Sequence, residues 1–225
     1  MRITIDRDLA ARAPGLTLGV VHGAGLKSRP SDPRLDGLVN ALCRDLEKDF
    51  AVGDIAALPE IAASRQLLRA AGVDPTKHRA SNEALLRRVA QKRGLYRLDT
   101  IVDINNYCSL KFRLPFGTYD RDHLEGDLVF RVGQAGEEYS GIGGVPTKAE
   151  GRPVLADAAK IVGGPVLDSD ATKVTSFTTD IVAVCYGPPG VAPAVVQSAI
   201  AALAALLTDI NGGTATTELV TTATP

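Results

Sequence analysis

The chain is 225 residues long, 45% hydrophobic, and has a formal net charge of −1, a length that buries a substantial core in one compact domain. This charge excludes a global attraction to nucleic acid, so any such contact needs a local basic patch. No apolar run approaches the roughly 20 residues that cross a bilayer, and the charged start is unlike a signal peptide, so we expect a cytoplasmic protein with no membrane or DNA partner.

The first half of the chain predicts one strand followed by three helices. Alternating apolar residues before a glycine turn indicate a half-buried strand near residues 16–20. Proline favours the first residue of a helix, and glycine adopts the left-handed conformation that ends one. The helices are expected from Asp32-Pro33, from Pro59 to Gly72, and from an N-cap at Ser81 to a last turn with Lys92 and Arg93.

The segment 99–144 is the densest in candidate chemistry. Apolar residues at spacings of three and four predict a helix from about Asp99 until Leu114-Pro115 stops it, with a hairpin further on. Asn105 and Asn106 lie in its middle, and because asparagine amides compete for backbone hydrogen bonds, two in succession favour a site. The predicted corner 114–117 would bring backbone close to a ligand beside this pair.

The second half predicts two strands, a helix and a tail. Strands are expected at 154–157 and 180–186, the second apolar enough to lie inside a sheet, and a helix from Pro193 to the glycines after Asn211. Helices and strands mix without a regular βα alternation, which favours an α+β fold. We expect a single domain over 1–210 and a mobile tail over 211–225.

A local basic excess lies between positions 77 and 97, where seven basic residues face the single acid Glu83. Such a run is most typical of a solvated helix face that complements the helix dipole, and the alternative is a phosphate-binding patch. The residues of the candidate RNA-binding patch are Lys77, Arg79, Arg87, Arg88, Lys92 and Arg93.

Other kinds of catalytic site find little support in the sequence. The three cysteines lack a C-x-x-C pattern and the three histidines lack metal spacing, so we expect neither a metal nor a cofactor. Ser109 lies within a helical segment rather than a nucleophile elbow. Glu137 and Glu138 are adjacent, and because neighbouring residues of a strand point to opposite faces, only one of them could face a pocket.

Five short motifs stand out along the chain: V-D-I-N-N-Y at 102–107, L-P-F-G-T-Y-D at 114–120, G-D-L-V-F-R at 126–131, G-E-E at 136–138 and V-L-A-D at 154–157. In this order they resemble the B3/B4 domain of the phenylalanyl-tRNA synthetase β subunit, and most of all the free-standing B3/B4 proteins. In the synthetase, this domain hydrolyses tyrosine wrongly esterified to the phenylalanine tRNA. The resemblance implies a three-layer α+β fold, with a β-sandwich of unusual topology flanked by helices and a pocket between the asparagine-bearing helix and glycine-rich strands.

The resemblance also places the pocket residues. The family's Thr-Asn pair corresponds to Asn105 and Asn106, and its P-x-H-A-F-D corner begins at Pro115, with Gly117 in place of the histidine. The asparagine amides could donate to the developing oxyanion, with the Gly143 backbone opposite. The implied pocket residues, none assigned a catalytic role, are Asn105, Asn106, Ser109, Pro115, Gly117, Asp120, Glu137 and Gly143.

Three hypotheses follow for the function. The first is a free-standing aminoacyl-tRNA deacylase, an enzyme that hydrolyses a mischarged aminoacyl ester. The second is a non-catalytic module that binds tRNA or an amino-acid-like molecule, which Gly117 favours because it removes a side chain from the pocket. The third is a small-molecule-binding protein unconnected with tRNA, since fold resemblance does not fix function.

Overall fold

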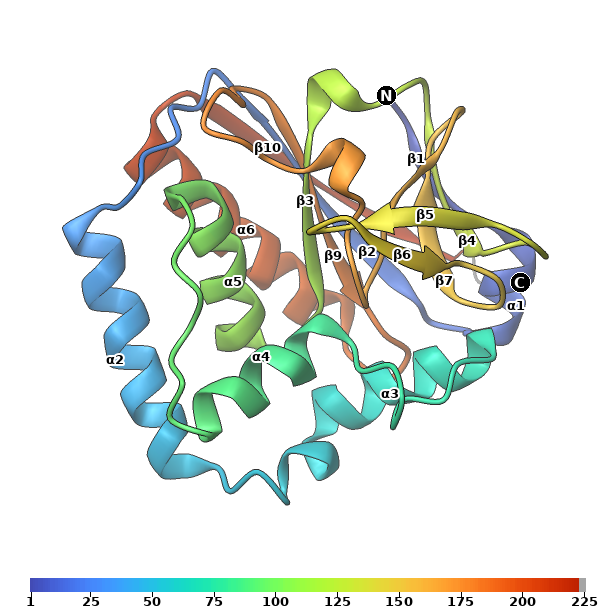
Figure 1. Ribbon diagram of the computed structural model, residues 1–225, viewed down its shortest axis with the longest axis horizontal. Helices are drawn as coiled ribbons and strands as arrows, with labels where there is room; N and C mark the ends of the chain where they lie inside the picture. Colours follow the sequence, from blue (N-terminus) through green and yellow to red (C-terminus); the bar gives the residue numbers. More distant parts are fainter. Residues whose placement is uncertain (223–225) are drawn as a thin grey trace.

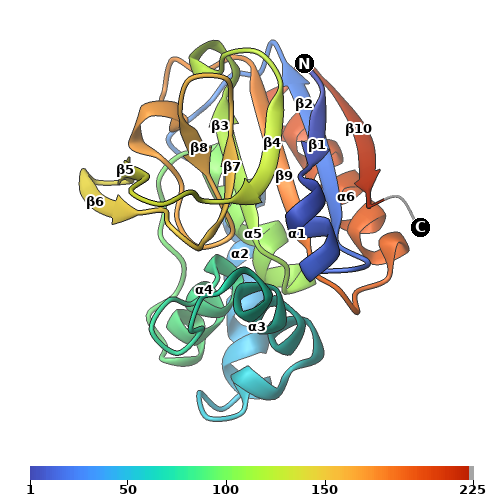
Figure 2. The same ribbon diagram turned by 90° about the vertical axis from the view of Figure 1, so that its right-hand side faces the viewer.

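The computed structural model describes residues 1–222 and has three layers (Figure 1). Two four-stranded sheets pack face to face as a β-sandwich, and helices cover the outer face of one sheet. The view in Figure 2 shows α3 and α4 below the two sheets. The predicted α+β fold with a sandwich flanked by helices is therefore confirmed.

The first sheet has the strand order β1-β4-β7-β8, and the second has the order β10-β2-β9-β3. Among the strands of residues 1–222, only β1 and β4 pair in parallel, and β5 and β6 form a separate hairpin. The strands are β1 Ile3–Ile5, β2 Thr17–Ala24, β3 Phe116–Asp120, β4 Leu128–Val132, β5 Glu138–Gly141, β6 Val145–Lys148, β7 Pro153–Ala156, β8 Ile161–Gly163, β9 Ile181–Gly187 and β10 Thr214–Thr221.

Capping side chains and a left-handed glycine mark the ends of several helices. The Asp32 and Asp99 side chains accept backbone N–H bonds at the starts of α2 and α5, and Gly72 ends α3 at φ 103°. The helices are α1 Arg7–Arg12, α2 Pro33–Asp49, α3 Pro59–Ala71, α4 Ser81–Ala90, α5 Thr100–Phe112 and α6 Pro193–Asn211, with short 3-10 turns at Ile55–Ala57, Arg121–His123 and Asp170–Thr172.

The sheet β10-β2-β9-β3, which is the central layer, separates the hydrophobic core into two clusters. On its inner face, side chains such as Val184 and Tyr186 of β9 meet Phe130 of β4, with the Phe130 and Tyr186 rings 4.9 Å apart. On its outer face, Ala183 and Cys185 pack against α2, α4, α5 and α6. Because both faces are covered, β9 is buried along its length, as its apolar run predicts.

The same geometry corrects the prediction for the first strand. The sequence predicts a half-buried strand near 16–20, but Leu18, Val20 and Val21 are all fully buried. The alternation of large and small residues, with Gly19 against Val196 and Ile200 of α6, had the appearance of a strand with one solvated face. Sequence alternation alone does not reveal that a second layer covers the strand.

By length and composition alone, helix α6 is long and apolar enough to cross a membrane. The sequence shows no unbroken apolar run of that length, because Gln197 and Ser198 interrupt this segment. In the fold, Val196, Ile200 and Leu203 on its inner face belong to the core beneath the central sheet.

Two local predictions fail for physical reasons. Helix α4 begins one residue earlier than expected, so its N-cap is Ala80, and the Ser81 hydroxyl has no partner among the described residues. Its helical turns end at Ala90, because Lys92 takes a left-handed φ of 59°. The predicted corner is also displaced: Arg113 makes the left-handed turn, and Gly117 belongs to β3.

Residues 214–221, which the sequence predicts as part of a mobile tail, form β10 and pair antiparallel with β2. The threonine-rich sequence suits an edge strand, whose outer side is solvated. Half-buried Leu219 and Val220 pack against the two core clusters, and the rest of the predicted tail beyond residue 222 lies outside the described residues.

Truncation after Gly213 should lower the free energy of unfolding by about 2 kcal/mol. It removes the core contacts of Leu219 and Val220 and leaves the edge of β2 unpaired. Urea denaturation of the truncated and parent chains measures the difference. Equal midpoints would show that β10 adds nothing to the stability of the sheet.

Candidate functional site

A cavity of about 610 Å³ opens between the asparagine-bearing helix α5, strand β3 and the segment 164–174. Its floor and walls are mainly apolar, with a few polar groups pointing inward, as is common for small-molecule pockets. The cavity is lined by Ser81, Ala84, Leu85, Tyr96, Leu98, Asp99, Val102, Asn105, Asn106, Phe116, Thr118, Ile142, Gly164, Val166, Leu167, Asp168, Lys173 and Val174.

Two amides and a hydroxyl form the polar side of this pocket. The Thr118 hydroxyl donates to Asn105 Oδ1 at 2.8 Å, which fixes the orientation of the amide. Asn105 Nδ2 is thereby directed away from Thr118, and Asn106 on the next position of α5 also lines the cavity. The pocket therefore presents amide N–H donors next to an apolar wall.

A carboxylate residue, Asp168, also lines the cavity and is partly exposed. The Tyr119 hydroxyl donates to Asp168 Oδ1 at 2.8 Å and lies 2.6 Å from the Tyr186 hydroxyl. Burial raises the pKa of Asp168 to about 7, although the bonds from Tyr119 and the Gly164 backbone act in the opposite direction. This group can thus exchange a proton near neutral pH.

A second cavity of about 760 Å³ adjoins the first and is strongly basic. It runs between α4 and the β5–β6 hairpin, and none of its lining residues within the described chain is acidic. We call it the basic groove. Its cationic lining residues are Lys77, Arg79, Arg87, Arg88, Arg93, Lys148 and Arg152.

The groove and the pocket adjoin each other. They share a wall made by α4, by Tyr96 and by the segment after β8. The shared lining residues are Ala84, Leu85, Tyr96, Val166 and Leu167.

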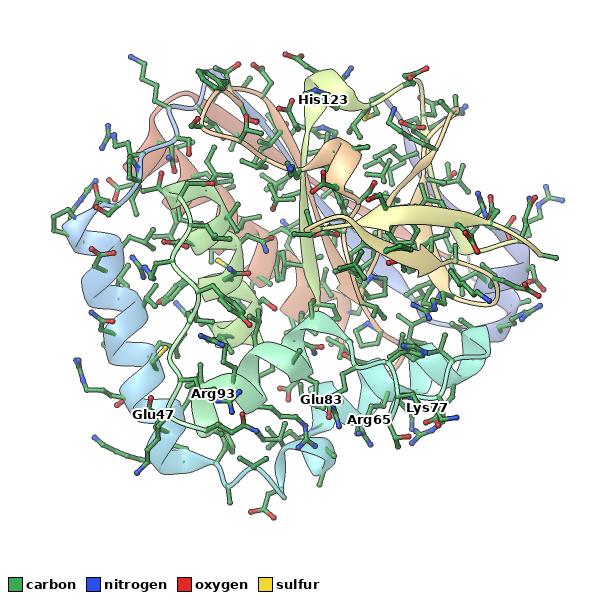
Figure 3. The ribbon with its side chains drawn as sticks, in the orientation of Figure 1. Glu47, Arg65, Lys77, Glu83, Arg93 and His123 are labelled. Atoms are coloured by element: carbon green, nitrogen blue, oxygen red, sulfur yellow. The ribbon has the colours of Figure 1, made fainter. Side chains whose placement is uncertain are left out.

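A buried acid organises the arginines of α4. Glu83 is 1% exposed and accepts from Arg65 Nε and Arg87 Nε, each at 2.8 Å, with Arg79 Nε at 3.7 Å. Figure 3 shows Glu83 and Arg65 side by side, with Lys77 and Arg93 to either side. Burial alone would raise the pKa of Glu83, but the arginine bonds outweigh it and lower the pKa. The cluster retains a net positive charge beside the groove.

Of the predicted pocket residues, the structure brings together Asn105 and Asn106 in the cavity, while Gly143 lies just beyond Ile142 on its rim. The Gly143 N–H group donates to Asp170 Oδ1 at 3.3 Å. Of the predicted patch, Lys77, Arg79, Arg87, Arg88 and Arg93 line the basic groove, but Lys92 does not, because its left-handed turn lies outside the lining.

The other predicted pocket residues lie elsewhere for identifiable reasons. Ser109 Oγ donates to the Leu114 carbonyl at 2.7 Å, and the Pro115 carbonyl accepts from the Tyr186 N–H group. Asp120 accepts from Thr178 at the far end of β3. Both oxygens of Glu137 bind the Arg131 guanidinium at 2.7 Å.

Gly117 departs most instructively from the prediction. It belongs to β3, where Phe116 and Thr118 face the pocket and residue 117 faces the sandwich interior. A Cβ atom at this position would collide with the Tyr119 hydroxyl and come within 2.8 Å of Asp168 Oδ1. The missing side chain therefore makes room for the Tyr119–Asp168 hydrogen bond and leaves no gap in the pocket.

Sequence reasoning assigned no role in the site to Asp168, Thr118 or Lys173. Asp168 lies in a polar, glycine-broken link, and nothing in the local sequence indicates that its carboxylate meets Tyr119 from 49 positions away. Thr118 offered a weak signal, since it lies between two residues already singled out in the same strand. Lys173 contacts Asp170 at 2.9 Å and lines the pocket mouth.

Residues 63–212, more than half of the chain, match the B3/4 domain family. The chain is 27% identical over 241 aligned positions to the phenylalanine–tRNA ligase beta subunit of Corynebacterium glutamicum, covering 95% of this chain and 28% of that protein. The corresponding subunit of Fusobacterium nucleatum is 31% identical over 99 positions, covering 43% of this chain and 12% of that protein. The chain thus spans well under half the length of these relatives.

One solved structure overlaps nearly the whole chain. An N-terminal fragment of the phenylalanyl-tRNA synthetase beta subunit from Pyrococcus horikoshii superposes with a TM-score of 0.49 and 14% identity. The overlap covers 95% of this chain and 50% of the fragment.

Proposed function

This chain belongs to the B3/4 domain family, and from that premise we propose that it binds the aminoacyl end of a tRNA and hydrolyses the ester. The observation that carries the proposal is that the basic groove adjoins a pocket lined by amide donors and a carboxylate residue. Phosphates would lie in the groove, and the amino acid would enter the pocket. Its place of action would be the cytoplasm.

The groove supplies the electrostatic half of the proposal. Its seven cationic side chains face no acid in the lining, although the protein as a whole is close to neutral. Such a local field attracts a polyanion whose binding releases counterions. Affinity for tRNA should therefore fall steeply as salt concentration rises.

The pocket supplies the chemical half. Asp168 holds a water molecule and accepts its proton as the water oxygen bonds to the ester carbonyl carbon. The asparagine amides of α5 donate to the carbonyl oxygen as it becomes negative, which lowers the barrier. The bond to the ribose oxygen then breaks, and the ribose oxygen takes up a proton, leaving free amino acid and a tRNA 3′-hydroxyl.

The test is amino-acid release from a panel of mischarged tRNAs. We expect the parent to release at least one amino acid faster than a no-protein control, and Asp168→Asn to reduce that rate by about 100-fold or more. Asp170→Asn is the matched control, because Asp170 is outside the cavity lining. Salt-sensitive binding without release from any member would assign the pocket to capture rather than hydrolysis.

The pH dependence gives an independent readout. Asp168 accepts a proton only when it is ionised, so the single-turnover rate should rise through about pH 7 and level off above it. A rate profile that is flat from pH 5.5 to pH 8.5 would exclude Asp168 as the base.

A further inference from the structure

Four apolar side chains stand exposed around the mouth shared by the groove and the pocket. The exposed fractions are 53% for Tyr96, 63% for Leu98, 43% for Ile142 and 52% for Val145. Of the eight exposed large apolar residues in the described part of the chain, half lie here. An apolar rim beside a polycationic groove fits a ligand that joins a flat apolar part to phosphates.

Tyr96 lies at the centre of this rim, since it lines both cavities. The guanidinium carbon of Arg88 lies 3.8 Å from the centroid of the Tyr96 ring, so one ring face is covered by a cation. With half of its surface still exposed, the ring is available to stack against a planar partner. Arg88 also lines the groove, where it is available to a phosphate.

The backbone below Tyr96 is held firmly by contacts on its other side. Arg97 Nε lies 3.1 Å from Asp103 Oδ2, and Asp36 also pairs with Arg97. The Leu98 N–H group donates to Asp103 Oδ1 at 3.0 Å. These contacts fix the segment on either side of its exposed residues, and they leave Tyr96 lining both cavities and Leu98 lining the pocket.

We propose that Tyr96 is the stacking platform for the terminal nucleobase of an RNA strand whose phosphates lie in the basic groove. This inference rests on the proposed function and adds to it the group that seats the RNA end at the pocket mouth. Aromatic side chains bind bases this way in many single-strand sites, because every base has a flat π face. The Arg88 guanidinium stacked behind the ring holds it in place for the base.

The test measures binding of short, uncharged RNA strands by fluorescence anisotropy, so that hydrolysis plays no part. One strand ends in CCA and its partner has the same length but an abasic 3′ nucleotide. We expect Tyr96→Ala to weaken binding of the CCA strand by about 5- to 100-fold. The same substitution should leave binding of the abasic strand within twofold of the parent, and Tyr96→Phe should bind both like the parent.

The matched control is Phe177→Ala, which removes an aromatic ring that is 91% exposed and lies outside both cavities. It should bind both strands like the parent. Equal affinity of the parent for the CCA and abasic strands would overturn the base-stacking proposal while leaving RNA binding in the groove intact. An equal loss of affinity for both strands in Tyr96→Ala would also overturn it. If the parent protein did not bind RNA even at low salt, the proposed function would be overturned as well.

Discussion

The Asp168→Asn variant is expected to be more stable than the parent protein at pH 8, by about 2 to 4 kcal/mol. Burial raises the pKa of Asp168 from 3.8 to about 7, so at pH 8 the folded protein must hold a charge that its surroundings disfavour. Asparagine is neutral at every pH and keeps a carbonyl oxygen that accepts from Tyr119. Removing the charge should therefore stabilise the fold while it abolishes the proposed chemistry.

The sign of the pH dependence follows from the two pKa values. Between about pH 4 and pH 7, Asp168 is protonated in the folded state and ionised in the unfolded state, so its contribution to stability decreases as pH rises through that window. The advantage of the variant should thus be small at pH 4.5 and fully developed at pH 8. Urea denaturation at both pH values measures it.

The control for this experiment is Asp170→Asn, two positions along the chain. A hydrogen bond from Lys173 is the main cause of a lowered pKa for Asp170, opposite in direction to Asp168. The control should therefore show no gain at pH 8. An Asp168→Asn variant that is less stable than the parent at pH 8 would contradict the view that the carboxylate is kept for function at a cost in stability.

Glu83→Gln should have the opposite effect and destabilise the protein by about 3 to 5 kcal/mol. The substitution keeps the size of the side chain but removes the negative charge that pairs with both Arg65 and Arg87. Two guanidiniums would then face each other in a poorly solvated space, and an amide NH₂ group would replace one acceptor. Because the network joins α3 to α4, the loss should also loosen the wall of the basic groove.

Chemical denaturation at pH 7 measures the change, and Glu138→Gln is the matched control. Glu138 is exposed, so the same chemical change there should alter stability by less than about 0.5 kcal/mol. If both variants were equally stable, the ion pairs of Glu83 would make no measurable contribution to the free energy of unfolding. The stability of Glu83→Gln should also fall less than the parent's between pH 6 and pH 3, since the lowered pKa of Glu83 no longer contributes.

The sequence predicts the helices well because their signals are local. Asp32, Asp99 and Gly72 act on backbone groups within a few residues of themselves, so their patterns identify helix ends without knowledge of the fold. The fate of residues 214–221 could not be predicted in this way. Their pairing with β2 joins positions nearly 200 apart, and their composition is as typical of a tail as of an edge strand.

In the candidate site, too, residues with a local sequence signal are predicted, and residues whose role depends on long-range contacts are not. Asn105 and Asn106 are conspicuous in a helix and do line the pocket, and most of the basic run lines the groove. Asp120 and Glu137 resembled site residues only by their place in a motif, and each has a partner of its own in the fold, Thr178 and Arg131. Asp168 becomes notable only after folding, when burial changes its proton affinity.

The wall shared by the groove and the pocket has a thermodynamic consequence. Val166 and Leu167 line both cavities, and Tyr139 donates to the Leu167 carbonyl at 2.9 Å, which ties this wall to the β5–β6 hairpin. A ligand in one cavity that displaces these residues changes the affinity of the other cavity, and by linkage the effect is equal in both directions. Occupancy of the groove would then tune the pocket, so an amino acid attached to RNA and the same amino acid free in solution would meet two different sites.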